Sequence, residues 1–182
     1  TGDESNIWGP PQARQYTYPH PTDIRFYAEE FSQAPEYTQN YYRWYENING
    51  PSPSTAWSGR GENQAIGSGN SPPGQGQILR LRMSVQLSNN FITANGQAFK
   101  LQYGEGSNCS AISEWQDVGT SSQSAIWTSA DNGVMPDDSP LNSSDLKLSV
   151  SDSAQSYEED NPSRLNPRQI SIGDDGEWDW VL

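Results

Sequence analysis

Cysteine, histidine and long apolar runs are scarce in this chain of 182 residues, and each scarcity excludes a class of protein. The single cysteine, Cys109, excludes an internal disulfide and a metal site built from a cysteine cluster. The single histidine, His20, excludes a histidine-rich zinc or copper centre. No stretch approaches the ~18 apolar residues that a membrane-spanning helix requires, so membrane insertion is not expected.

Positive charge is scarce as well. Ten Lys and Arg residues stand against 23 Asp and Glu, for a net charge of −13, and most of the excess lies in residues 131–182. Nucleic acids and anionic membranes repel such a protein, so neither is an expected partner. A composition rich in Ser, Asn, Gln, Gly and Thr is typical of secreted proteins, and a chain that opens at Thr1 without Met is expected to be a processed product. We therefore expect an extracellular or cell-surface location.

Aromatic residues, in contrast, are plentiful: seven Trp, nine Tyr and four Phe. Disordered chains are poor in aromatics, so this composition indicates a folded domain with a thin aromatic core. The 16 Gly and 13 Pro residues favour frequent turns and disfavour long helices. Long polar loops are expected between short strands.

Alternation of apolar and polar residues predicts where these strands lie. The clearest covers residues 78–87, where Leu81, Met83 and Val85 alternate with Arg80, Arg82 and Ser84, which predicts one buried face and one face in water. An Asn95-Gly96 turn predicts that residues 99–103 return as a hairpin partner. Further strands are expected at residues 24–31, 41–48, 114–118, 124–128, 147–150 and 178–182.

This pattern predicts an all-β fold, an antiparallel β-sandwich of the immunoglobulin-like type with long polar loops. Residues 1–22 carry no periodic apolar pattern and several prolines, so they are expected to form an extended N-terminal segment or linker. The sandwich domain is then expected to cover residues 23–182.

The sequence offers no convincing set of catalytic residues, and an enzyme is not expected. His20 lies in a proline-rich segment, and Cys109 has no histidine near it in the sequence. A glycoside hydrolase needs two carboxylates that face each other across a cleft, and the sequence alone places no such pair.

Calcium is the candidate cofactor, because hard cations prefer clustered carboxylate and carbonyl oxygens. The candidate ligands are Asp131, Asp137, Asp138, Glu158, Glu159 and Asp160. None of these segments matches an EF-hand loop. The alternative is that they are solvated turn residues, because Asp and Asn next to Gly are common in turns.

Exposed tryptophan side chains suggest a second kind of ligand, a glycan, because aromatic faces can stack on sugar rings. Trp57 is the candidate ligand-binding residue, since it is the one large side chain in a polar loop at residues 51–76. For Trp44 and Trp127 the alternative is a place in the core, which a domain with few aliphatic residues needs.

Four segments together resemble a known module: residues 42–47 (YRWYEN), 79–82 (LRLR), 99–104 (FKLQYG) and 156–180, from SYEE through NP to EWDW. They are similar to the immunoglobulin-like, CARDB-type (cell-adhesion-related) sandwiches of large secreted or surface proteins of uncultured bacteria. The resemblance covers residues 23–182 and implies a non-enzymatic extracellular module, with no established ligand residues. In similar modules a further aromatic strand, often with a cysteine, follows the EWDW strand. On that pattern, this sandwich lacks its closing strand and Cys109 its usual partner.

The leading hypothesis is therefore a structural or adhesive module, either a subunit of a surface filament or part of a larger surface protein. A carbohydrate-binding module is the alternative. A sheet without its last strand exposes backbone groups that recruit another strand. The N-terminal segment is a possible donor, and its candidate assembly residues are Ile7, Trp8, Tyr16 and Tyr18. The alternatives are that this segment folds back on its own subunit or does not fold.

Overall fold

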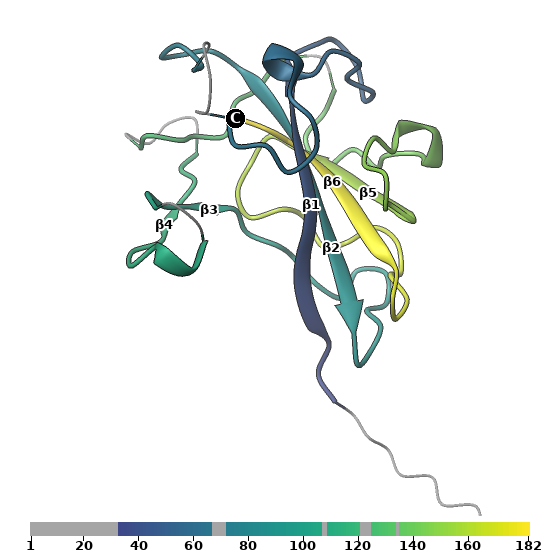
Figure 1. Ribbon diagram of the computed structural model, residues 1–182. Coiled ribbons are helices and arrows are strands. Elements are labelled where there is room, and N and C mark those ends of the chain that lie inside the picture. The colour runs from purple at the N-terminus through teal and green to yellow at the C-terminus, as the bar shows by residue number, and fades with distance from the viewer. Residues whose placement is uncertain (1–32, 67–71, 107–108, 121–124, 134) are drawn as a thin grey trace, which may run out of the picture. The chain divides into compact units, whose positions relative to one another are not determined.

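A four-stranded sheet forms the centre of the structure, a computed structural model that describes residues 33–66, 72–106, 109–120, 125–133 and 135–182. Its strand order is β1–β2–β6–β5, and the strands lie side by side in Figure 1. Their bounds are Glu36–Glu46 for β1, Leu79–Ser88 for β2, Ser153–Glu158 for β5 and Asp175–Val181 for β6. The described residues belong to one compact unit, Gln33–Leu182. The domain boundary expected after residue 22 and the strand expected at residues 24–31 lie outside the described residues.

The remaining elements are short. β3 (Gln102–Tyr103) and β4 (Gln116–Asp117) form a separate two-stranded antiparallel sheet. Three 3₁₀ turns, η3 (Trp57–Gly59), η4 (Cys109–Ala111) and η5 (Ser143–Asp145), are the only helical elements among the described residues. The described part of the chain is therefore all-β, as its composition predicts.

The central sheet is mixed, which corrects the expectation of a purely antiparallel fold. β2 pairs antiparallel with β1 and β6, but β5 runs parallel to β6. The strand expected at residues 147–150 is wrong, because this segment leads through a turn into β5. Of the strand expected at residues 124–128, the described residues 125–128 contribute only a single bridge from Thr128 to Gly119.

The expected hairpin between β2 and residues 99–103 is also wrong. Both edges of β2 are already occupied, by β1 and by β6. The Asn95-Gly96 turn does form, with the Gly96 amide donating to the Thr93 carbonyl at 3.1 Å. The chain then leaves the sheet, and residues 97–101 bond instead to residues 161–166.

One face of the sheet carries the larger hydrophobic core. Leu81 and Leu87 of β2 meet Trp178 and Trp180 of β6, and the cluster is completed by Ile92, Leu101, Val118, Ile170 and Leu182. Because Leu101 and Val118 come from residues 97–118, the segment around β3 and β4 packs over this face. The alternating apolar positions of β2 and β6 face the core, as their period-two pattern predicts.

The opposite, polar face of β2 is not in water, so the expectation of one solvent-exposed face for this strand is wrong. Arg80, Arg82 and Ser84 are each 0% exposed. Loop residues cover them: Arg80 Nη1 donates to the carbonyls of Ile48 and Gly50, and Arg82 Nη2 donates to the carbonyl of Pro51. The polar alternation of β2 therefore marks a buried polar face.

Candidate functional site

A ladder of buried charges lies on this polar face, between β2 and β6. We call Arg80, Arg82, Glu177 and Asp179 the charged ladder; all four side chains are fully buried. Arg82 Nη1 lies 3.0 Å from Glu177 Oε1, and Arg82 Nη2 lies 3.1 Å from Asp179 Oδ2. Arg80 Nε donates to Asp179 Oδ1 at 3.0 Å. A sequence gives no direct signal that such alternating charges are buried, since the same pattern is typical of a solvated face.

The surroundings of the ladder indicate a structural role. Glu177 also accepts backbone N–H groups of Lys147 and Leu148. Burial lowers the pKa of Arg82, an effect that the negative charge of Glu177 opposes. Burial likewise lowers the pKa of Arg80 to about 10, so the Arg80 guanidinium group stays charged at neutral pH. Because all four charges are buried and paired, the ladder offers no surface to a ligand.

Three of the six predicted calcium ligands converge at the end of β5. Oxygen atoms of Asp137, Asp138 and Glu158 lie within 4.8 Å of one another, and we call these three residues the acidic cluster. The Glu158 carboxyl is buried, and the Ser156 hydroxyl and the Arg164 amide donate to it. Desolvation raises the pKa of Glu158 to about 8, with a further upward contribution from the two aspartates.

The other three predicted ligands lie elsewhere. Asp131 accepts the amide of Gly133 in a local turn. Glu159 Oε1 accepts both the Tyr157 hydroxyl and the Asn132 amide. Burial and this contact with Glu159 raise the pKa of Tyr157. Asp160 is exposed.

A groove crosses the apolar face of the sheet on the side of β1. It consists of two adjoining hollows of about 310 Å³ and 330 Å³, which share Gln39, Met83 and Leu101. The first hollow is also lined by Tyr42, Trp44, Tyr103, Ile112, Trp115 and Trp127. The second is also lined by Tyr37, Val85, Ala98, Phe99, Lys100 and Trp178. We call the two hollows together the aromatic groove.

Aromatic contacts shape this groove. Trp44 and Trp127 lie with their ring centres 5.5 Å apart and their planes tilted by 33°, and both pack against the core while lining the first hollow. Tyr37 meets Phe99 edge to face at 5.5 Å beside the second hollow. Tyr37 and Trp115 remain 44% and 45% exposed at the rim. The groove is therefore an apolar surface that is open to solvent.

The structure does not bring the predicted ligand-binding residue to this groove. Trp57 is half-buried in η3 and lines neither hollow. The assembly residues Ile7, Trp8, Tyr16 and Tyr18 lie outside the described residues. Tyr37, Gln39 and Phe99 were not identified from the sequence as binding residues, because only the packing of residues 97–101 over the sheet places them around a shared hollow.

Among the described residues, no helix has the length and apolar character to cross a membrane. Comparison of the chain with protein-family models, with curated proteins and with solved structures finds no match.

Proposed function

We propose that this chain is a non-enzymatic structural or adhesive module of the cell exterior, as a subunit of a surface filament or as part of a larger surface protein. The observation that supports this proposal is the aromatic groove, an apolar surface on one face of the sheet with two exposed aromatic side chains, Tyr37 and Trp115, at its rim. Exposed apolar patches of this kind are typical of protein–protein contact sites. The acidic composition and the resemblance to cell-adhesion-related modules agree with an extracellular role.

We further propose that the fold is an immunoglobulin-like sandwich that is open on one side. Support comes from Leu101 and Val118, which pack from outside the central sheet into its apolar core. The small sheet of β3 and β4 lies in the same segment, and its Tyr103 packs against this core. The aromatic groove lies where this second layer leaves the face of β1 uncovered.

Sedimentation of the full chain over the micromolar range tests the proposed function. The wild type is expected to associate as its concentration rises, and a double variant of the groove rim, Tyr37→Ser with Trp115→Ser, is expected to associate less. Ile172→Ser is the matched control, because Ile172 is 58% exposed and lines neither hollow. A wild type that stays monomeric, or a rim variant that associates as the wild type does, contradicts the proposal.

A carbohydrate-binding module is the second candidate, and the first hollow supports it. Trp44, Trp115 and Trp127 there supply aromatic faces of the kind that stack on sugar rings. Binding to an array of glycans separates the two functions. Saturable binding that Trp115→Ala abolishes would favour the carbohydrate-binding module, and Trp57→Ala tests the residue that the sequence indicates. The structural module predicts no saturable glycan binding.

Calcium remains a proposal for the acidic cluster. Three carboxylates supply oxygens of the type that calcium prefers, although calcium takes about six to eight ligands and would need further oxygens. The Arg164 guanidinium donates to the Asp138 carbonyl at 2.6 Å, which places a positive charge nearby. Calcium would have to displace the proton that the raised pKa of Glu158 favours.

A further inference from the structure

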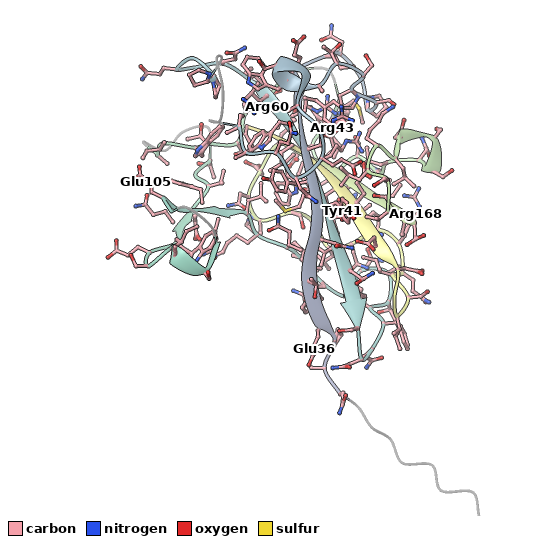
Figure 2. The ribbon with its side chains drawn as sticks, viewed as in Figure 1. Glu36, Tyr41, Arg43, Arg60, Glu105 and Arg168 are labelled. Carbon is pink, nitrogen blue, oxygen red and sulfur yellow. The ribbon has the colours of Figure 1, made fainter. Side chains whose placement is uncertain are left out.

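Among the described residues, no strand pairs with the outer edge of β1 along its first half, and we call this half the open edge. The backbone amides of Leu79 and Leu87 in β2 donate to Leu182 and Asp174, on the side of β6. Because backbone groups of successive strand residues point to opposite edges, those of the even-numbered residues of β2 point towards β1. The register pairs Thr38 with Gln86, which leaves the N–H and C=O groups of Tyr37 and Gln39 pointing away from the sheet. Within the described part of the chain, no hydrogen bond reaches these outward groups. Figure 2 labels Glu36 at the start of this open half and Tyr41 and Arg43 farther along β1.

The second half of β1 and the outer edge of β5 both form backbone hydrogen bonds with loop residues, unlike the first half of β1. In the second half of β1, the Glu46 amide donates to the Thr55 carbonyl and the Asn63 amide donates to the Tyr42 carbonyl. On the opposite side of the sheet, β5 is covered by residues 139–141, since the Leu141 amide donates to the Gln155 carbonyl at 2.9 Å.

A second open edge faces the same hollow. In the extended segment 97–101, the amides of Gln97, Phe99 and Leu101 donate to the side chains of Asn166, Ser163 and Asn161. Alternation therefore directs the backbone groups of Ala98 and Lys100 to the other side. Among the described residues, the backbone groups of Ala98 and Lys100 form one hydrogen bond, in which the side chain of Gln97 donates to the Ala98 carbonyl at 2.7 Å.

Both open edges border the second hollow of about 330 Å³. Tyr37 and Gln39 line it from β1, Ala98 and Lys100 line it from the segment 97–101, and Trp178 contributes from β6. Unpaired backbone beside an apolar hollow is the combination that strand addition uses: main-chain hydrogen bonds supply affinity and side-chain pockets supply specificity.

We propose that the second hollow binds residues 15–18 of another copy of this chain as an added strand on β1. This inference rests on the proposed function and names the partner of the groove. In an extended strand Tyr16 and Tyr18 point to the same side, so both can enter an apolar hollow together. Residues 15–18 carry no charge, so the donor brings no acidic side chain of its own into the apolar hollow.

Prolines that follow the donor residues limit the length of the added strand. Pro19 and Pro21 cannot donate backbone hydrogen bonds, which limits the added strand to a few residues, as short as the open half of β1. Donation from copy to copy is a head-to-tail contact, so it builds open chains unless it closes into a ring.

Two full-length variants test this proposal. Gln39→Pro removes the outward N–H of the open edge and keeps the donor segment; Gln39→Ala, which keeps the N–H, is its control. Tyr16→Asp with Tyr18→Asp disables the donor and keeps the hollow; Tyr16→Phe with Tyr18→Phe is its control. Native mass spectrometry and sedimentation measure the sizes of the species formed by each variant and by an equimolar mixture.

The wild type and both controls are expected to form chains that lengthen with concentration, whereas each test variant alone loses all species larger than the monomer. The mixture is expected to form dimers that do not grow, because one partner supplies the donor and the other supplies the hollow. The mixture needs only the N-terminal segment of Gln39→Pro, so misfolding of that variant around the edge does not prevent the dimer.

Three results would overturn the inference. The first is a wild type that is monomeric at every concentration, as a segment folded back on its own subunit predicts. The second is assembly of either test variant at the wild-type level, and the third is a mixture that stays monomeric. If both test variants assemble but the groove-rim variant Tyr37→Ser with Trp115→Ser does not, the donor assignment fails while the proposed function stands.

Discussion

The buried carboxyl of Glu158 should make the stability of this protein depend on pH, and Glu158→Gln should remove that dependence. Desolvation raises the pKa of Glu158 from its ordinary value of 4.5 to about 8 in the folded state. Between these two values the folded state holds a proton that the unfolded state has lost. Stability from this group is therefore fully present below pH 4.5 and is lost as the pH rises through 8.

The size of the effect follows from the shift. A difference of one pKa unit corresponds to about 1.4 kcal/mol, so this shift corresponds to about 3–5 kcal/mol of unfolding free energy. Glutamine keeps a carbonyl that can accept the Ser156 hydroxyl and the Arg164 amide, and it never ionises. Glu158→Gln should match the wild type below pH 4.5 and exceed its stability by a few kcal/mol above pH 8.

Chemical denaturation at a series of pH values, in buffers that contain a chelator, measures this difference. Subtracting the two profiles removes the contributions of other titrating groups. Asp138→Asn is the control: it removes a neighbouring negative charge that raises the Glu158 pKa, so its profile should lie between the other two. A difference between Glu158→Gln and the wild type that stays constant from pH 5 to pH 9 would refute the argument.

Three further predictions concern the acidic cluster, the charged ladder and a glycine of β6. Millimolar calcium should raise the melting temperature, and more at pH 8 than at pH 6, because Glu158 must lose its proton to bind the ion; equal melting temperatures in calcium and chelator would contradict this. Arg82→Met should lower the unfolding free energy by about 3–5 kcal/mol, because it leaves Glu177 buried without its cation; a loss below 1 kcal/mol in urea denaturation would show that the ladder is dispensable. Gly176→Ala should cost about 1–3 kcal/mol, because the new Cβ would lie 2.3 Å from Ile170 Cδ1, and unchanged thermal unfolding would contradict that contact.

The sequence predicts the strands that alternate cleanly and misses the one that does not. β2 and β6 follow from their period-two patterns, and most of β1 follows from its run of aromatic residues. β5 contains Gln155, Ser156 and Glu158, all 0% exposed, and nothing in its composition separates it from a loop. Its polar groups bond to residues outside the strand, such as Arg164 and Arg168, which lie 6 and 13 positions from their partners in the sequence. Burial of polar residues by such partners is a tertiary effect that local periodicity does not contain.

The candidate sites show the same limit. Acidic composition is enough to select Asp137, Asp138 and Glu158, but it also selects Asp160, which is exposed at the turn after β5. Which carboxylates meet depends on the path of the loops around β5. The aromatic groove is less predictable still, because Tyr37 and Phe99 lie far apart in the sequence and meet only where residues 97–101 pack beside β1.

The charged ladder also has a consequence for synthesis of the protein. Arg80 and Asp179, which pair across the centre of the sheet, are 99 residues apart in the sequence. At the usual pace of translation, β6 leaves the ribosome about 5–20 seconds after β2. Throughout that interval the guanidinium groups of β2 lack their carboxylates, and the apolar side of the same strand lacks its tryptophans. In the nascent chain, β1 and β2 are therefore expected to stay without their packing and ion-pair partners until β6 emerges. During that time the chain is a substrate for chaperones that bind exposed strands.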